Sequence, residues 1–416
     1  MSSANTKVLK VAIVGAGPGG LAAAILLSRL PFVELSVFEQ ARELREVGAG
    51  ISINQNTWRL LQVLGAADAL EEFGKRGDQS VDPNTPARSR IERYKLQQAL
   101  LSRVSPDLIQ LRKRLRKIDD SDDDTFLEFE DDSTAGPFHL VVGADGLRSA
   151  VRQHAFPDHK IAYTGKVAYR VLIPQEKVAH IPNIPPGSCF WHTPSTHVYT
   201  NPLDNGLFEI ATRATESEED GNKVSWGQVV PKSQVVKHYQ EYCDTIRAVI
   251  DAPDEWLEFA MFGGPKLETV ISGGRIVLIG DASHRSGAAF AFEDAFTLSS
   301  ALEYTWNRRL SVAKALEIFD SVRGPHYEKL FAVLDAMAAN AKAAAISAKD
   351  DSNHRVEQTV SKNWKANETA WIFEHNVWKD WVTLNDLKEL NLNAGDPEAV
   401  EGSREAFAPP AVSIAA

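Results

Sequence analysis

Three glycines near the N-terminus have the spacing of a dinucleotide-binding turn. Gly15, Gly17 and Gly20 form a GxGxxG motif. In such a motif the first glycine permits a tight turn, the second lets a pyrophosphate approach the backbone, and the third lets helix and strand pack closely. Glu39 follows about 20 residues later, where a carboxylate can accept hydrogen bonds from a ribose 2′-hydroxyl. These residues predict a nucleotide without a 2′-phosphate, and NAD and FAD fit them equally.

A strand, a helix and a second strand are expected to hold these residues in place. Residues 8–14 (VLKVAIV) and 33–40 (VELSVFEQ) read as strands, and residues 21–30 read as a small-residue helix. The helix N-terminus would offer free amides and a partial positive charge to the phosphates. A GxGxxG motif alone is weak, but this setting makes it specific. The alternative is a tight strand–helix turn that binds no ligand.

The composition argues against several other kinds of protein. The 416 residues carry a formal net charge of −11, whereas a nucleic-acid interface needs a basic face. Two cysteines, Cys189 and Cys243, cannot form a disulfide framework, and no Cys/His spacing suggests a metal site. No run reaches the ~18 apolar residues of a membrane helix, and the N-terminus lacks the apolar core of a signal peptide. We therefore expect a cytoplasmic protein with no metal, no nucleic-acid partner and no membrane contact.

Two later segments each place an aspartate after an apolar strand. They are LVVGADGLRSAVR (residues 140–152) and RIVLIGDASH (residues 275–284). Taken alone, each could be a plain strand–turn–helix. Together with GAGPGG at residues 15–20, they resemble the three fingerprints of the group A flavin monooxygenases, the fold typified by para-hydroxybenzoate hydroxylase. The resemblance spans residues 8–330 and is closest to the fungal salicylate-hydroxylase-like enzymes, a group that includes enzymes that dearomatise polyketide phenols.

The resemblance implies that the cofactor is FAD and assigns roles to individual residues. Asp281 would bond the ribityl hydroxyl of the flavin, and Arg93 would contact its ribityl and pyrophosphate region. Asp145 and Arg148 would brace the pyrophosphate loop. A helix beginning near Glu293 would direct its positive end at the isoalloxazine ring and stabilise the negative charge of a reduced flavin. The expected FAD-binding residues are Gly15, Ala16, Gly17, Pro18, Gly20, Glu39, Gln40, Arg42, Gly50, Ile51, Arg93, Asp145, Arg148, Asp281, Gly287 and Ala288.

Between residues 155 and 265 the pattern changes to short alternating segments, which are typical of antiparallel strands. The family's substrate-binding sheet is expected here, with Arg170, His192 and His197 as substrate-binding residues. Arg170 looks like the arginine that stabilises the substrate phenolate in the dearomatising enzymes. Tyr199 is the second catalytic candidate, and Asn201 stands where those enzymes have their tyrosine. For each candidate the alternative is an ordinary strand residue.

The expected fold is α/β, with a Rossmann-type FAD-binding domain interleaved with a mostly antiparallel substrate sheet and followed by a helical C-terminal region. The FAD-binding domain would be discontinuous, formed by residues 1–154 and 266–330. Residues 155–265 would form the substrate domain, residues 331–393 the C-terminal helices and residues 394–416 a flexible tail.

The resemblance implies an FAD-dependent monooxygenase of secondary metabolism that hydroxylates a phenolic aromatic with NAD(P)H and O2 through a flavin C4a-hydroperoxide. The reaction could be decarboxylative or dearomatising. NADH or NADPH would be a transient hydride donor, since no second GxGxxG is present. A monomer or a homodimer is expected. The alternatives are a non-catalytic FAD-fold escort protein and a flavin halogenase, whose WxWxIP motif the sequence lacks.

Two segments are shorter than is usual in the family, at residues 74–91 and 284–287. Three explanations compete: a natural shortened variant, a sequence that lacks mobile loops, or a protein that kept the fold and lost full flavin chemistry.

Overall fold

The computed structural model describes residues 8–44, 50–70, 88–121, 124–193, 195–203, 206–217, 227–284, 287–347 and 371–383. The chain divides into two compact units, Met1–His375 and Asn376–Ala416. In the second unit, residues 377–383 are helical. The predicted tail at residues 394–416 and most of the two short segments, at residues 71–87 and 285–286, lie outside the described residues.

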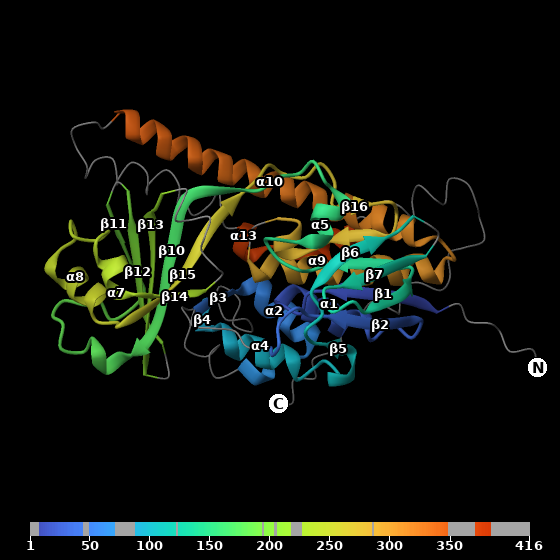
Figure 1. Cartoon of the computed structure of the whole chain (residues 1–416), viewed down its shortest axis with the longest axis horizontal. Coiled ribbons are helices and arrows are strands. Elements are labelled where there is room, and N and C mark those ends of the chain that lie inside the picture. The colour runs from blue at the N-terminus through green and yellow to red at the C-terminus, as the bar shows by residue number, and fades with distance from the viewer. Residues whose placement is uncertain are drawn as a thin grey trace, which may run out of the picture. The chain divides into compact units, whose positions relative to one another are not determined.

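A six-stranded, mostly parallel sheet forms one half of the first unit (Figure 1). Its strand order is β16-β17-β9-β1-β2-β5, and only β16 runs antiparallel to its neighbour. Its strands are β1 (Leu9–Val14), β2 (Val33–Phe38), β5 (Ile109–Gln110), β9 (Leu140–Gly143), β16 (Ile271–Ser272) and β17 (Ile276–Leu278). This order, with β1 between β2 and β9, confirms the predicted Rossmann-type arrangement.

Both faces of this sheet are covered, which is why β1 and β9 are almost continuous runs of buried apolar residues. Helix α1 packs on one face and also contacts α9. A three-stranded meander covers the other face, where Phe38 of β2 contacts the rings of Phe129 and Phe138. The covering elements are α1 (Pro18–Leu27), α9 (Ala288–Asn307), α10 (Val312–Ser347), β6 (Leu115–Asp119), β7 (Thr125–Phe129) and β8 (Thr134–Phe138).

A second six-stranded sheet forms the other half of the unit and is antiparallel throughout. Its strand order is β11-β12-β13-β10-β15-β14. The strands are β10 (Ala162–Pro174), β11 (Cys189–His192), β12 (His197–Pro202), β13 (Leu207–Thr215), β14 (Gln228–Pro231) and β15 (Glu255–Gly263). This sheet confirms the expected antiparallel part of the fold, whereas the predicted domain boundaries stay a prediction.

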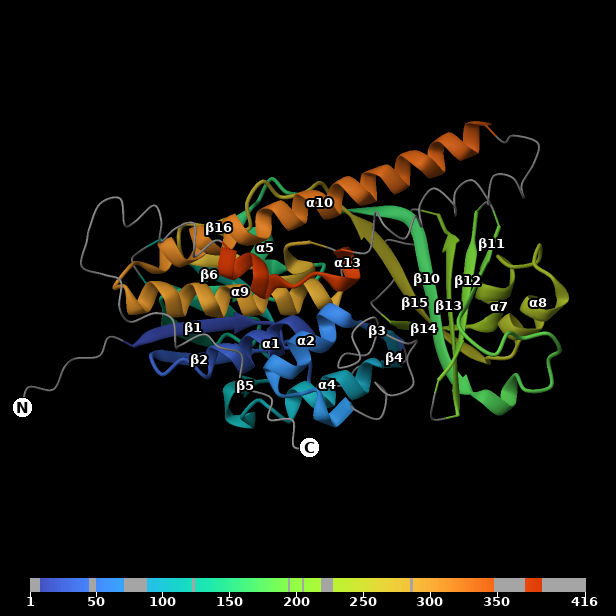
Figure 2. The ribbon, with the colours of Figure 1, turned by 180° about the vertical axis from the view of Figure 1, so that it is seen from behind.

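The two faces of the second sheet differ. One packs its apolar residues, among them Tyr169 and Trp256, against the short helices α7 (Lys232–Val236) and α8 (Asp244–Asp251). The opposite face is turned toward the small hairpin of β3 (Gly50–Asn54) and β4 (Arg88–Glu92), as both views show (Figures 1 and 2).

The remaining elements are short connections and supporting helices. They are α2 (Gln55–Leu64), α4 (Arg93–Leu101), α5 (Ala150–Ala155), α13 (Trp371–Glu374) and the 3-10 turns η1 (Asp68–Leu70), η2 (Pro106–Leu108), η3 (Gln175–Lys177) and η4 (Gly280–Ala282). Among the described residues, no helix combines the length and apolarity that crossing a membrane requires.

Candidate functional site

The glycine turn between β1 and α1 has the geometry of a nucleotide cradle. A Cβ atom on Gly15, which has φ +102°, would lie 2.4 Å from the carbonyl oxygen of Ala144. A Cβ atom on Gly20 would lie 1.9 Å from the carbonyl oxygen of Gly15. A Cβ atom on Gly17 would meet no heavy atom within 4 Å. Packing therefore fixes the first and third glycines, while the space in front of the second is open, as a phosphate requires. Ala16 and Pro18 complete this turn, and Pro18 is the first residue of α1.

Glu39 is held at the end of β2 beside this turn. Its carboxylate accepts hydrogen bonds from the backbone N–H groups of Ala16 and Ala41, both at 2.8 Å. A carboxylate can accept about four hydrogen bonds, so it keeps capacity for a ribose hydroxyl. Gln40 and Arg42 follow with exposed side chains.

The Asp145 side chain caps the start of α5 in the second motif. Its Oδ2 atom accepts hydrogen bonds from the N–H groups of Ala150 (2.7 Å) and Val151 (3.2 Å) at the start of α5. Burial raises the pKa of Asp145. Arg148 is exposed, and its guanidinium lies 4.7 Å from the ring centre of Phe262 on β15. Asp145 thus orders the loop, while Arg148 reaches toward the second sheet.

Arg152, which the sequence analysis did not single out, joins the second and third motifs. Its Nη1 atom donates to the carbonyl oxygen of Ala282 at 2.7 Å, and its Nη2 atom donates to that of Leu147. The GADG and GDASH segments therefore share one buried guanidinium.

A buried carboxylate that the sequence analysis also missed, Asp294 of α9, holds the GDASH turn. It accepts hydrogen bonds from the N–H of Gly280 (2.9 Å), His284 Nε2 (2.9 Å), Arg323 Nε (2.8 Å) and the hydroxyl of Tyr327 (2.7 Å). Burial alone would raise the pKa of Asp294, but the charges of His284 and Arg323 hold it well below its usual range. The neighbouring Asp281 side chain is exposed at the surface of the turn.

Helix α9 begins at Ala288, with Gly287 as its N-cap at φ +89°. The expectation that this helix starts near Glu293 is therefore wrong. Glu293 lies buried in the second turn of α9. Its Oε1 atom bonds the Nδ1 atom of His375 at 3.1 Å. Its Oε2 atom forms an ion pair with Nη1 of Arg323 at 2.9 Å, in an orientation that makes no hydrogen bond. The first turn of α9 holds no acidic residue, so its positive end is not neutralised there.

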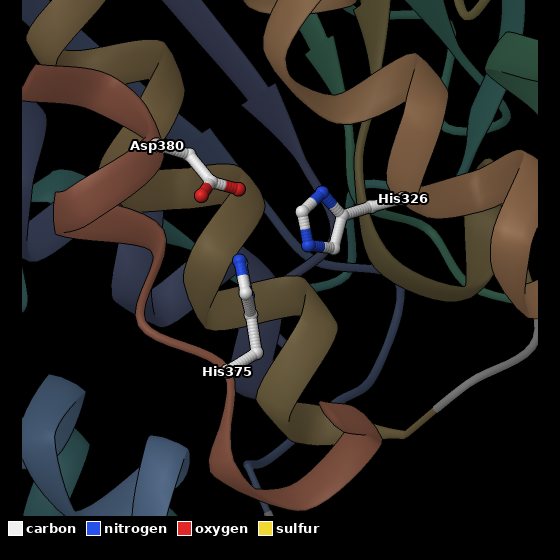
Figure 3. Close-up of side chains that lie close together, drawn as sticks. All are labelled: His326, His375 and Asp380. Atoms are coloured by element: carbon white, nitrogen blue, oxygen red, sulfur yellow. The ribbon is translucent and has the colours of Figure 1, made fainter. Parts of the chain in front are cut away.

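Two imidazoles lie beside this carboxylate. The rings of His326 and His375 lie with their centres 3.8 Å apart (Figure 3). Asp380, also labelled in Figure 3, belongs to the second unit. Within the first unit, α9, α10 and the segment after α13 are thus joined by a buried network of carboxylates, one arginine and histidines.

The four predicted substrate residues share one face of the second sheet. Strand register pairs His192 with His197, and Tyr199 with Ala211, which in turn pairs with Arg170. Residues paired directly across antiparallel strands point to the same side. This is the face opposite α7 and α8, because Tyr169, the neighbour of Arg170, packs into the apolar core there. Arg170 and Tyr199 are separated by one strand, so their backbones lie about 10 Å apart at two strand spacings.

Arg170 is a half-buried cation among other cations. Burial, followed by the charges of Arg93 and Arg90, lowers the pKa of Arg170 to about 10, so it remains charged at neutral pH. Its guanidinium lies 5.6 Å from the ring centre of Phe259, and it has no hydrogen bond or ion pair to a described residue. Arg93, the first residue of α4, is thus close enough to influence it.

Glu209 and Arg90 tie the hairpin to this face, and neither was predicted. Two hydrogen bonds join them, Nε to Oε2 at 2.7 Å and Nη2 to Oε1 at 2.6 Å, and Gly50 N–H donates to Oε1 at 3.0 Å. Burial alone would lower the pKa of Arg90, but Glu209 raises it. The guanidinium also lies 5.2 Å from the ring centre of Tyr199, whose hydroxyl donates to Ser188. Ile51, next to Gly50, lies on β3.

A sequence signal existed for some of the missed residues. The charged pair Glu293-Asp294 interrupts a run of apolar and small residues in α9, and a charge inside such a run calls for a buried partner. Arg152 and Arg90 carry no comparable signal, because their partners are distant in the sequence.

Comparison with known proteins identifies the family. The family described as FAD binding domain matches residues 8–309. The chain is 29% identical to 6-hydroxynicotinate 3-monooxygenase of Bordetella bronchiseptica over 327 residues, covering 71% of this chain and 83% of that protein. It is 26% identical to salicylate hydroxylase of Pseudomonas putida, covering 77% and 83%. A solved salicylate hydroxylase substrate complex superposes with a TM-score of 0.70 at 20% identity, covering 90% of this chain and 98% of that one.

The last comparison concerns the fold alone, and the family match covers most of the chain. The chain belongs to the FAD binding domain family, and its expected place among the FAD-dependent aromatic monooxygenases, with FAD as cofactor, is confirmed.

Proposed function

We propose that the enzyme hydroxylates a phenolic ring, with NADH or NADPH as a transient hydride donor and O2 as the oxidant. The similar proteins named above act on 6-hydroxynicotinate and salicylate, which are hydroxylated aromatic rings. The observation that carries the proposal is Arg170, a half-buried cation on the sheet face turned toward β3 and β4. It forms no hydrogen bond or ion pair with a described residue, and the charge of Glu209 acts on it less than burial and the charges of Arg93 and Arg90 do.

The predicted FAD-binding residues fit the cofactor. The open space at Gly17 would admit the pyrophosphate, and the Glu39 carboxylate, held by Ala16 N–H, would accept a hydrogen bond from the ribose. The unneutralised start of α9 at Ala288 would face the flavin ring. When bound, FAD supplies the capacity to take a hydride and to activate O2 for transfer of an electrophilic oxygen.

The role of the protein is to bind, orient and polarise the substrate. A phenol ring becomes far more electron-rich when its oxygen carries negative charge, and a nearby fixed cation stabilises that charge. We assign this part to Arg170, because burial makes its electrostatic influence stronger than that of a solvated arginine. Tyr199 stays a candidate for positioning the ring, with its own ring against Phe190 at 4.7 Å.

The test has two stages. The purified protein should be yellow, and its flavin absorbance should bleach on addition of NADH or NADPH without air. Arg170→Met should leave this reduction intact while product formation from a phenol falls by ~10²-fold or more, the scale for removal of one electrostatic stabiliser. Arg114→Met, on an exposed arginine whose Nε atom lies 3.5 Å from the carboxylate of Glu130, is the matched control. Unchanged turnover in Arg170→Met would remove Arg170 from the mechanism, and a protein that takes up no FAD would favour the escort alternative.

A further inference from the structure

The ion pair of Arg90 and Glu209 joins two parts of the chain that are far apart in sequence. Arg90 lies on β4 of the hairpin, and Glu209 lies on β13 of the second sheet, 119 residues later. Glu209 is fully buried. The two hydrogen bonds between the side chains, at 2.7 and 2.6 Å, fix the direction of the guanidinium as well as its distance. The pair therefore sets how the hairpin stands on the sheet.

Both strands of the hairpin contribute to this contact. Arg90 also donates to the hydroxyl of Ser52, its partner across β3 and β4, through its Nη1 atom at 2.9 Å. A Cβ atom on Gly50 would lie 2.5 Å from Oε2 of Glu209 and 2.8 Å from Nε of Arg90, so the hairpin backbone touches the pair directly. Gly50 and Ile51 are expected FAD-binding residues, so the pair connects that part of the chain to the sheet.

On the sheet, the pair lies next to the row that holds the two catalytic candidates. Glu209 precedes Ala211 by two residues on β13, and Ala211 pairs with both Tyr199 and Arg170. Two residues advance a strand by roughly 7 Å and keep the side chains on one face. The guanidinium of Arg90 lies over the ring of Tyr199, 5.2 Å from its centre. The hairpin thus contacts Tyr199 through Arg90.

The pair fixes geometry while adding little net charge. The charges of Arg90 and Glu209 act on Arg170 in opposite directions. Stability alone does not explain the pair, because replacement of a buried ion pair by apolar residues is often neutral or stabilising. Apolar residues would not supply the fixed orientation of two charge-assisted hydrogen bonds. The pair is therefore best explained by the position that it imposes on the hairpin and on Tyr199.

We propose that Arg90 and Glu209 are positioning residues for the hydroxylation, which hold the hairpin and Tyr199 in one frame so that substrate ring and cofactor meet at a fixed distance. Neither side chain is assigned a contact with the reacting atoms. The inference rests on the proposed function, because it concerns alignment within the same reaction. Misplacement of reacting groups by about 1 Å can cost ~10²-fold in rate.

Alignment decides between two reactions of O2. In the hydroxylation, NAD(P)H, H⁺, O2 and the phenol give NAD(P)⁺, water and the hydroxylated phenol, so one oxygen atom enters the ring. When no ring is within reach, NAD(P)H, H⁺ and O2 give NAD(P)⁺ and hydrogen peroxide, and the same two electrons reduce O2 alone. Loss of alignment should therefore lower the yield of product per NAD(P)H oxidised, while reduction of the flavin continues.

Three variants separate positioning from stability. Arg90→Met and Glu209→Gln each break the pair, whereas the double variant removes both charges, so its stability should recover toward that of the native protein. Turnover would be measured on the FAD-bound proteins with phenol, catechol, resorcinol and 4-hydroxybenzoate. Product per NAD(P)H oxidised should fall ~5-fold or more in all three variants, with hydrogen peroxide rising in step. Arg90→Lys keeps the charge without the two-point contact and should give an intermediate yield.

A second measurement needs no turnover. Fluorine NMR of FAD-bound protein labelled with 3-fluorotyrosine would follow the resonance of Tyr199, assigned by its absence in Tyr199→Phe. This resonance should shift or broaden in all three variants, because the guanidinium is lost from the ring or no longer held over it. Arg114→Met, on an exposed arginine elsewhere, should change neither the yield nor the resonance.

Three results would overturn the assignment. They are an unchanged yield in the single variants, a yield that recovers with stability in the double variant, and an unchanged Tyr199 resonance in all three variants. Absence of product from every phenol with the native protein would instead count against the proposed function. The fluorine measurement would still test whether the pair positions Tyr199, since it requires no substrate.

Discussion

The buried carboxylate of Asp294 gives the sharpest prediction about stability. Asp294→Asn preserves the shape of the side chain but removes its charge, leaving Arg323, which is fully buried, with only Glu293 as a counter-ion. One oxygen also becomes an NH2 group, which faces a donor in either orientation: the N–H of Gly280 at the Oδ2 position or the hydroxyl of Tyr327 at the Oδ1 position. Removing one partner of a buried ion pair costs about 3–5 kcal/mol.

The corresponding shift in melting temperature follows from size. At about 2.1 cal/mol/K per residue, unfolding the unit Met1–His375 has an entropy of roughly 0.8 kcal/mol/K. The free-energy loss in Asp294→Asn therefore predicts a melting temperature lower by roughly 4–6 °C. Calorimetric unfolding of the apo and FAD-bound forms would measure it. The melting temperature of the FAD-bound form should fall further than that of the apo form, because Asp294 also holds the GDASH turn through Gly280 and His284.

The pH dependence carries a definite sign. Because the pKa of Asp294 is lowered in the folded protein, its contribution is present above its unfolded pKa of about 3.9 and is lost as pH falls through the folded value. The difference between native protein and Asp294→Asn should therefore shrink below about pH 4. Asp254→Asn, which removes an exposed partner of Lys177, is the control and should leave the midpoint unchanged. An unchanged midpoint in Asp294→Asn would refute the reasoning.

Two further predictions concern the glycine turn and the hairpin. Gly20→Ala should destabilise the fold strongly, since the new Cβ atom would lie 1.9 Å from the carbonyl oxygen of Gly15. Gly17→Ala should leave the melting temperature unchanged and weaken FAD binding, since its Cβ atom would meet no protein atom within 4 Å. Fluorescence titration with FAD beside thermal unfolding would separate the two effects, and equal behaviour of the variants would contradict the assignment. Glu209→Gln should cost about 3–5 kcal/mol in chemical denaturation by leaving the Arg90 charge unpaired, while Glu209→Gln with Arg90→Met should cost less than the sum of the single changes. Strict additivity would show that the pair contributes nothing.

The sequence predicted the parts of the site that depend on local pattern. The glycine turn was predictable from its local motif, since Gly20 packs against the carbonyl oxygen of Gly15 in the same turn, although the close neighbour of Gly15 itself is the distant Ala144. The alternation between residues 155 and 265 likewise predicted antiparallel strands and placed Arg170, His192, His197 and Tyr199 on them. The roles proposed for these four residues stay predictions.

What depends on distant pairing was not predictable. Tyr199 meets Ala211 only through the register of β12 on β13, and Glu209 meets Arg90 across 119 residues. The start of α9 was misplaced because an acidic residue usually marks the first turn of a helix. Glu293 instead pairs with two residues distant in the sequence, Arg323 of α10 and His375 after α13. A charge that serves tertiary structure cannot be told from a helix-capping charge in one sequence.

The close approach of Gly15 to Ala144, together with the reach of Arg152 to Ala282, has a consequence for recombination. The three motifs, separated by more than a hundred residues each, are joined by one close backbone approach, Gly15 to Ala144, and by one side chain, Arg152, that bonds the carbonyl oxygen of Ala282. A chimera that takes residues 1–120 from one homologue and the rest from another inherits the two sides of the Gly15–Ala144 contact from different parents. The second sheet between residues 162 and 263 lies outside those contacts but is tied to the hairpin through Glu209 and Arg90, so a chimera that exchanges this sheet must keep that pair matched.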